Sequence, residues 1–205
     1  MPSMWFASTC LGSGVASVTN VCSNCHVFQA QLFVTSPHKD AFAAMGLPGC
    51  VTCHSNHGIK HPTDDMIGMG AKAVCTRCHT ESDEGARQAV AMNDQLTNLA
   101  SAIAASDELL SRAKRQGMEV SQALQQEEQA RDALLKARVT VHTFSDGELK
   151  RDTDSGLAIA RQTHFAGEEA MDEWRFRRIG LGLSVLAIAL TVVGLGLYIR
   201  NMERG

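Results

Sequence analysis

The feature that most constrains this chain is a five-residue pattern that occurs three times within its first 80 residues. The segments are Cys22–His26, Cys50–His54 and Cys75–His79, and each reads C-x-x-C-H. Each places two thiols about one helical turn apart and an imidazole directly after the second thiol. Three kinds of site use paired cysteines of this spacing: covalent haem attachment, zinc coordination and a disulfide framework.

Covalent haem c accounts for every fixed position of the pattern. The two thiols add across the vinyl groups of the porphyrin, and the adjacent histidine binds the iron on the proximal side. Zinc ribbons and disulfide frameworks do not require histidine after every second cysteine, and three such coincidences have odds of about one in 10⁴–10⁵. The sequence therefore predicts three haems c. The residues expected to bind them are Cys22, Cys25, His26, Cys50, Cys53, His54, Cys75, Cys78 and His79, with the three histidines as proximal iron ligands.

The segment from Cys22 to His79 resembles the small multihaem cytochromes c, the class III proteins and their relatives with repeated C-x-x-C-H. The resemblance includes the sequence pattern around the second motif, at Phe33–His38 before it and at Cys53–Ile59, which extends beyond it. The helical remainder with its apolar C-terminus resembles membrane-anchored members of the group. The resemblance implies electron transfer in the periplasm or at the cell surface, without fixing the partners.

Composition agrees with a domain whose core is made of cofactor. Aromatic residues are 5% of the chain, and residues 21–80 have no periodic apolar pattern. Three macrocycles within about sixty residues would fill the space that large side chains normally occupy. The net charge is −3 with no block of Lys and Arg, which argues against nucleic acid as a partner.

Closed coordination of three irons requires three further ligands. His38, in a Ser-Pro-His turn between two motifs, is the first candidate, and His57 is the second, directed at a neighbouring haem. His61 is the alternative to His57. Ligation by methionine, from Met66 or Met69, would raise the potential, but the surplus of histidine favours low-potential bis-His sites. His164 is expected to be solvated.

His142 is the third candidate and depends on how the helical region folds. Small or apolar residues recur with alternating steps of four and three, which is the seam of a coiled coil or helix bundle. The seam is Met92, Leu96, Leu99, Ile103, Ser106, Leu110, Ala113, Gly117, Val120 and Leu124. It would then reach Glu127 and Arg131, where it is expected to degrade. One straight helix over 84–140 would span about 85 Å, against about 46 Å for the return from Glu148 to Arg178. A bend at Gly117 would bring His142 back to a haem; a continuous helix is the alternative.

The C-terminal part of the sequence predicts a helix that ends in a membrane anchor. Ser145–Glu148 forms a capping box that opens a helix. Ile179–Ile199 is 21 residues without a charge, long enough to cross a bilayer. Because haem c is attached outside the cytoplasm, residues 1–178 are expected on the outer face of the cytoplasmic membrane. The arginines flanking the span are too evenly distributed to decide the orientation.

The sequence predicts a mostly α-helical protein in six parts. These are an N-terminal segment (1–20), a trihaem domain (21–80), a long coiled-coil or hairpin region (81–144), a membrane-proximal helix (145–178), a transmembrane helix (179–199) and a cytoplasmic tail (200–205). Residues 1–20 lack the features of a secretory signal, so we expect an incomplete N-terminus, with Cys10 a spare thiol.

Two functions remain open from the sequence. The first is a membrane-anchored trihaem cytochrome that relays electrons between a quinol-oxidising membrane partner and periplasmic carriers or reductases. The second is a haem subunit of an oxidoreductase that acts on small nitrogen or sulfur compounds, which requires an open iron. No Lys- or Tyr-based active-site motif is visible, which favours the first. The seam of the helical region is also a candidate for pairing with another subunit.

Overall fold

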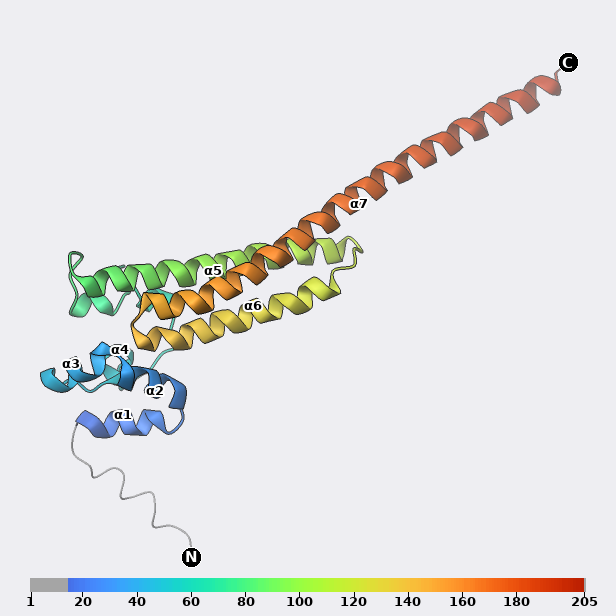
Figure 1. Cartoon of the computed structure of the whole chain (residues 1–205). Coiled ribbons are helices and arrows are strands. Elements are labelled where there is room, and N and C mark those ends of the chain that lie inside the picture. The colour runs from blue at the N-terminus through green and yellow to red at the C-terminus, as the bar shows by residue number, and fades with distance from the viewer. Residues whose placement is uncertain (1–14, 205) are drawn as a thin grey trace, which may run out of the picture.

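The computed structural model describes residues 15–204, which are helical and contain no strand. Four short helices come first, and three long helices follow (Figure 1). The short ones are α1 (Val15–Ser23), α2 (Val27–Thr35), α3 (Pro37–Met45) and α4 (Cys50–His54). The long ones are α5 (Glu84–Arg115), α6 (Ser121–Thr140) and α7 (Asp146–Met202). Single 3₁₀ turns lie at Asp64–Met66 (η1), Cys75–Arg77 (η2) and Val141–Thr143 (η3). The predicted α class is confirmed.

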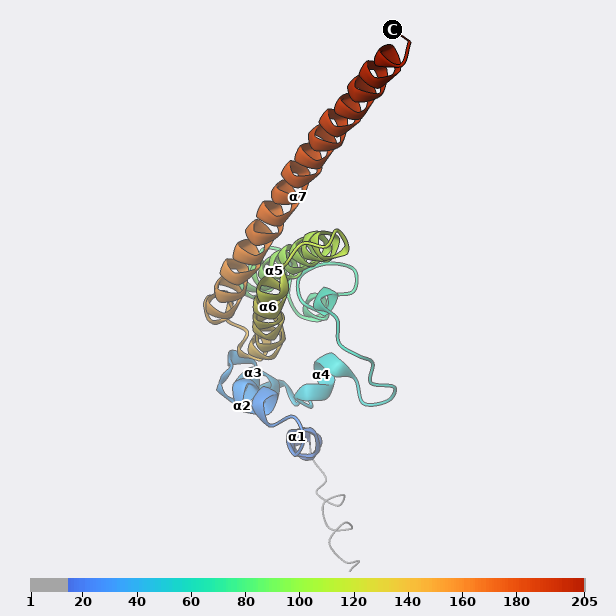
Figure 2. The same cartoon turned by 90° about the vertical axis from the view of Figure 1, so that its right-hand side faces the viewer.

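The long helices form an antiparallel bundle with the short helices at one end. Figures 1 and 2 show α5, α6 and the first half of α7 side by side, while the second half of α7 extends away from the opposite end. The turn η3 packs against α2, which joins the bundle to the short helices. The loop between α5 and α6 therefore lies far from the C-x-x-C-H motifs, and the turn between α6 and α7 lies beside them.

The bend predicted at Gly117 is confirmed. Helix α5 ends at Arg115, and Gly117 has a left-handed backbone with φ of 79°. The amide of Met118 donates to the carbonyl of Ala113 at 3.1 Å, which closes the helix end as in a Schellman motif. Glycine adopts this conformation without the steric cost that a Cβ would impose. The chain therefore reverses, and α6 runs back toward the motifs.

Each long helix buries one stripe whose steps alternate four and three. The predicted seam of α5 from Met92 to Ala113 is buried throughout. Beyond the bend the register changes because a new helix begins, so Ala130 is buried where Arg131 was expected, and Arg131 pairs with Asp107 at 2.7 Å. On α7 the stripe consists of Leu149, Thr153, Gly156, Ala160, Thr163, Gly167 and Ala170.

Glu127 corrects the expectation that the seam degrades. Its side chain is 1% exposed and lies in a polar layer shared by all three helices. Ser106 donates to its carboxylate at 3.0 Å, Thr163 also bonds to that carboxylate, and the two hydroxyls are 2.8 Å apart. A buried carboxylate is tolerated where hydroxyl donors replace part of its hydration. The layer aligns one residue from each helix and so favours a single register.

Helix α7 crosses the expected boundary at residues 178 and 179 without a break. Its 57 residues include a window with mean hydropathy 2.3, none of which is buried in the protein. Trp174 is half-buried against the end of the bundle, and Arg178 lies over its ring at 4.9 Å. The C-terminal half of α7 is thus long and apolar enough to span a membrane.

Residues 21–80 bury very little of their own side-chain surface. In the described structure their buried apolar side chains are Phe33, Phe42 and Ala73. The long loop after α4 is attached to the bundle by the packing of Ile67 on the bundle core and by polar contacts. Arg138 of α6 makes a bidentate ion pair with the Asp64 carboxylate, at 2.8 and 2.9 Å. Asn93 of α5 donates to the backbone carbonyl of Asp64 at 3.0 Å. This sparse core agrees with the expectation that macrocycles fill the domain.

Truncation of Leu99 tests the bundle core. Leu99 is 0% exposed, so Leu99→Ala should lower the free energy of unfolding by about 2–5 kcal/mol, through lost burial and the cavity that remains. Leu135 of α6 is 58% exposed, and Leu135→Ala should change it by less than about 0.5 kcal/mol. Chemical denaturation followed by far-UV circular dichroism measures both. Equal effects of the two changes would contradict this packing.

Candidate haem-binding site

All three C-x-x-C-H motifs form a turn of helix that brings the first cysteine and the histidine to the same side. In the first motif the amide of His26 donates to the carbonyl of Cys22 at 2.9 Å. The third motif repeats this bond, from His79 to Cys75, at 2.9 Å. The second motif is helix α4 itself. This local geometry follows from the sequence spacing, because residues i and i+4 share one helix face.

The motifs lie next to one another. Burial raises the pKa of the Cys50 thiol, and Cys22 from the first motif raises it further. Burial also raises the pKa of Cys53 to about 11, with Cys75 of the third motif as the next contribution. The second motif therefore lies between the other two. Cofactors attached to such neighbouring motifs would be close enough for electrons to pass between them.

Gly49 allows helix α1 to approach the second motif. Its φ is 54°, and a Cβ at this position would overlap the hydroxyl of Thr19 on α1. Only glycine combines this left-handed backbone with the absence of a side chain. The contact holds the first and second motifs together.

His38 and His79 face each other across the junction of short helices and bundle. His38, near the start of α3, has its ring centroid 5.9 Å from that of His79 in the third motif, with an interplanar angle of 79°. The His38 ring packs against Phe144 at 4.0 Å and Phe42 at 5.3 Å. Burial lowers the pKa of His38, and the neighbouring His79 adds to this. The neutral imidazole that results is the form that binds a metal.

His54 and His142 make a second pair. Their ring centroids are 6.1 Å apart and nearly parallel, at 20°. His142 Nδ1 is 2.9 Å from the carbonyl of Val139, so that nitrogen carries the proton and Nε2 is left free as a ligand. Burial lowers the pKa of both rings, and the proximity of His26 lowers each further. The chain reversal thus brings His142 to the second motif and close to the first.

The ring-centroid distances within the two histidine pairs match the distance expected for two imidazoles on one iron. Imidazole nitrogen binds a metal at about 2 Å, so two imidazoles on opposite sides of one ion have ring centroids about 6 Å apart. The observed 5.9 and 6.1 Å agree with that value. Within residues 15–204, no three or more His, Cys, Asp or Glu side chains gather into a cluster of the kind a zinc site requires. The two histidine pairs are thus candidate axial ligands.

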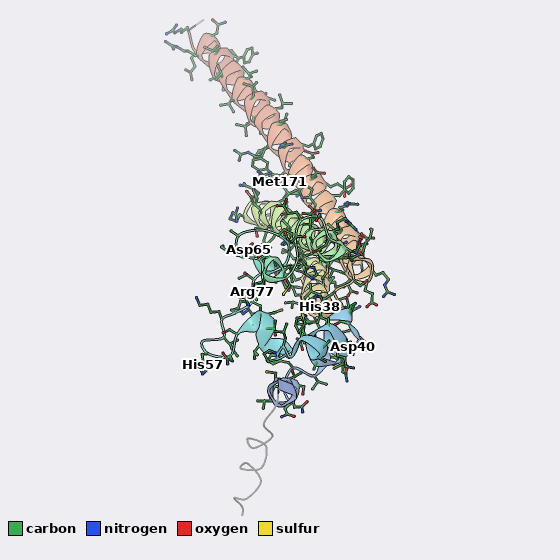
Figure 3. All side chains as sticks on the ribbon, turned by 90° about the vertical axis from the view of Figure 1, so that its left-hand side faces the viewer. His38, Asp40, His57, Asp65, Arg77 and Met171 are labelled. Carbon is green, nitrogen blue, oxygen red and sulfur yellow. The ribbon has the colours of Figure 1, made fainter. Side chains whose placement is uncertain are left out.

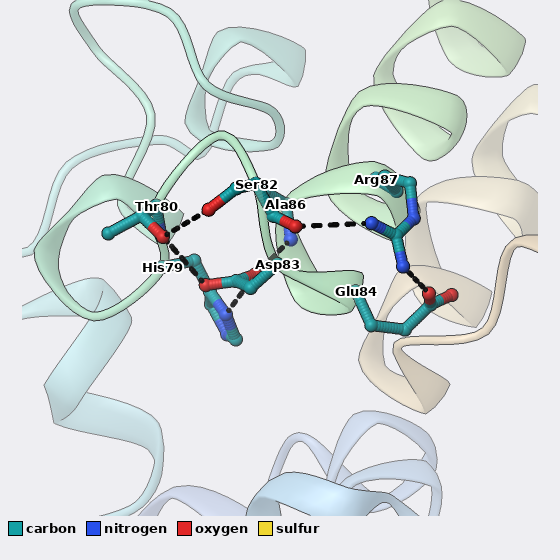
Figure 4. A network of polar contacts seen from close by, with 7 residues as sticks. All are labelled: His79, Thr80, Ser82, Asp83, Glu84, Ala86 and Arg87. Carbon is teal, nitrogen blue, oxygen red and sulfur yellow. Dashed lines mark hydrogen bonds and ion pairs between the residues drawn. The ribbon is translucent and has the colours of Figure 1, made fainter.

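Asp83 connects His79 to the first turn of α5, as Figure 4 shows. Its carboxylate is 3.1 Å from His79 Nδ1 and accepts from the amides of Thr80 and Ala86, each at 2.8 Å. These two amides, followed by His79, lower the pKa of Asp83. The same residue caps α5 and holds the ring of the motif histidine.

Gly85 completes this arrangement. A Cβ at Gly85 would overlap the ring of His79, so the absence of a side chain lets the ring lie on the first turn of α5. Glycine near a helix start otherwise weakens the helix. Neither Asp83 nor Gly85 was predicted from the sequence as part of the site. The helix-start pattern Ser82-Asp83-Glu84 could have identified the cap, but nothing in the sequence indicated its contact with His79.

The remaining sequence candidates lie elsewhere. His57 and His61 are exposed on the loop after α4, and Figure 3 shows His57 at the outer edge of that loop. His57 Nδ1 is 3.0 Å from the side-chain oxygen of Asn56, and neither ring contacts a motif histidine in the described chain. His164 lies half-buried on α7, 3.7 Å from Glu168. Ligation by His57 stays a prediction. Met66 and Met69 are half-buried in the loop, and Cys10 lies outside the described residues.

Comparison with known proteins supports the haem assignment. A family model described as a doubled CXXCH motif matches residues 36–84, which include His38 and the second and third motifs. No curated protein and no solved structure matches the chain. The match supports a multihaem protein of the c-type cytochrome kind, with covalently bound haem c and a role in electron transfer.

Substitution of Gly85 tests the approach of His79 to α5. Gly85→Ala should displace the His79 ring and convert one haem from low spin to high spin, measured by electron paramagnetic resonance (EPR). Gly147→Ala is the matched control, because Gly147 holds the same position in α7 and a Cβ there meets only Ser145 Oγ, at 3.9 Å. The control should leave the spectrum unchanged and stabilise the helix by about 0.5–1 kcal/mol. Identical spectra for both variants would contradict the contact.

Proposed function

We propose that this chain is a membrane-anchored trihaem c-type cytochrome that relays electrons. The observation that carries the proposal is the pairing of His38 with His79 and of His54 with His142 at separations of 5.9 and 6.1 Å. Paired histidines leave no position on the iron for a substrate, which is typical of electron-transfer sites. The bound haems supply one-electron chemistry, and the protein holds and orients them.

Each residue of the site then has a role. The six motif cysteines bind the three haems, and His26, His54 and His79 are the proximal ligands. His38 completes the coordination at the third motif, and His142 does so at the second. At the first motif His57 is the distal ligand, with His61 as the alternative. His26 is exposed, whereas His54 and His79 are half-buried.

The second candidate function is a haem subunit of an oxidoreductase for small nitrogen or sulfur compounds. The exposed His26, together with the surface position of His57 and His61, is the observation that favours it. If neither loop histidine reaches the first haem, that iron has an open position. The other two motifs offer no such opening, and the relay is therefore the better-supported function.

The bundle is a spacer between the haems and the bilayer. Residues 146–178 of α7 rise about 50 Å, and the usual tilt of about 20° shortens this by only about 3 Å. The loop between α5 and α6 packs near Ala170 and Trp174 at the membrane end, while the motifs lie at the other end. Quinol within the bilayer is therefore too distant to be the direct donor. The partner is a quinol-oxidising complex with an extramembrane redox domain that reaches this height.

The location and partners follow from this arrangement. The anchor holds the protein in the cytoplasmic membrane with the haem domain on the outer face, where haem c is attached. Electrons pass from the membrane complex through the three haems to periplasmic carriers or reductases, or in the reverse direction. No nucleic acid is involved.

Removal of one distal ligand at a time tests the relay. Each of His38→Ala and His142→Ala should convert one of three low-spin haems to high spin, while the haem count by pyridine haemochrome stays at three. His57→Ala should do the same for the haem of the first motif. His164→Ala is the control and should leave every haem low spin. A wild-type protein with a high-spin haem that responds to nitrite, hydroxylamine or sulfite would favour the oxidoreductase function.

Reconstitution tests the spacer. In proteoliposomes that contain menaquinol, the haems of the full chain should stay oxidised. Addition of a water-soluble electron shuttle should then reduce the haems, and haem absorbance measures both results. Resistance to carbonate extraction first establishes that the chain is inserted. Rapid reduction by the quinol alone would contradict a haem domain held about 50 Å from the bilayer.

A further inference from the structure

We propose that Asp83 lowers the reduction potential of the haem at the third motif, acting as a positioning and charge-donating residue through His79. This inference rests on the proposed function, because it assigns His79 as an iron ligand. It sets the order of potentials within the relay. No feature of the C-x-x-C-H pattern itself encodes it, since Asp83 lies four residues beyond the motif.

The carboxylate of Asp83 is fixed in place. Its Oδ1 lies 3.1 Å from His79 Nδ1 and 2.8 Å from the amide of Ala86, and its Oδ2 accepts from the amide of Thr80 at 2.8 Å. Both oxygens are thus held by backbone donors, one in the turn before α5 and one in its first turn. A hydrogen bond on Nδ1 leaves Nε2 of His79 as the iron-binding nitrogen and fixes the plane of the ring.

The other paired histidines have no such partner. His142 Nδ1 bonds to a neutral backbone carbonyl, that of Val139, at 2.9 Å. His38 Nδ1 is buried and has no hydrogen-bond partner. Within residues 15–204, Asp83 is the one carboxylate hydrogen-bonded to a paired histidine. Both pairs consist of two histidines, but only the His38–His79 pair has a carboxylate hydrogen-bonded to one of its rings in the described structure.

The direction of the effect follows from electrostatics. A carboxylate on Nδ1 draws the proton toward itself and makes the imidazole a stronger donor to the metal. Oxidised iron carries one more positive charge than reduced iron, so both the stronger ligand and the nearby negative charge favour the oxidised form. Reduction adds one electron and breaks no bond to the protein. The side chains of His79 and Asp83 are 29% and 38% exposed, so water screens part of the effect.

The charges around Asp83 do not cancel it. Glu84, the next residue, adds negative charge and is paired with Arg87 and Gln88. Arg87 also donates to the carbonyl of Ser82 at 3.2 Å rather than to the Asp83 carboxylate. The N-terminal end of α5 carries a partial positive charge that offsets part of the charge of the carboxylate. Asp83 is the N-cap of this helix and accepts a hydrogen bond from the Ala86 amide. The charged group in contact with His79 in the described structure is therefore a carboxylate.

Replacement by asparagine separates charge from geometry. Asp83→Asn retains one oxygen that can cap α5 and accept from His79, but it removes the charge and the oxygen that accepts from the Thr80 amide. At a fixed ambient potential, the ratio of reduced to oxidised iron at one haem should rise up to tenfold, equivalent to 59 mV. Potentiometric titration followed by optical and EPR spectra measures this haem by haem. The haem count should not change.

Two further variants make the test decisive. Asp83→Ser keeps the cap and is too short to hold His79, so it should shift the same haem and broaden its low-spin signal. Glu84→Gln removes an equal charge one residue away without a contact to His79 and should shift the potential far less. Unchanged potentials in Asp83→Asn, or an equal shift in Glu84→Gln, would overturn the proposal. If Cys75→Ser/Cys78→Ser leaves the haem count unchanged, the proposed function fails instead.

Discussion

The structure depends on one long-range approach, the return of η3 to the short helices. The left-handed turn at Gly117 reverses the chain, and the length of α6 then places Val141–Thr143 against α2. This single approach delivers His142 to His54 and Phe144 to the ring of His38. Without it, the motif region would lack both the candidate ligand His142 and the apolar contact of Phe144.

The same arrangement couples the haem region mechanically to the C-terminal helix. Helix α7 begins four residues after His142 and continues without interruption into the apolar segment. Its small residues, such as Gly156 and Gly167, let α5 and α6 pack closely, and the layer around Glu127 aligns the three helices. Under the proposed function, the length of this bundle sets the height of the haems above the membrane.

Several elements were predictable because they depend on local spacing. The C-x-x-C-H turns, the seam from Met92 to Ala113 and the cap at Ser145 all follow from residues within a few positions of one another. The register of α6 was not predictable, because the helix break at Gly117 starts a new helix with its own phase. As a result Ala130, not Arg131, lies on the buried stripe. Glu127 was misjudged since its hydroxyl partners, Ser106 and Thr163, come from two other helices.

The sequence by itself determined the helical class, the attachment residues for haem c and a C-terminal helix apolar enough for a membrane. These are properties of short segments, where covalent spacing or helix periodicity suffices. Only the tertiary structure decided which histidines meet, which one contacts a carboxylate and how far the motifs lie from the apolar segment. Those relations join residues such as His38 and His79, or His54 and His142, whose separation in space depends on the packing of three helices.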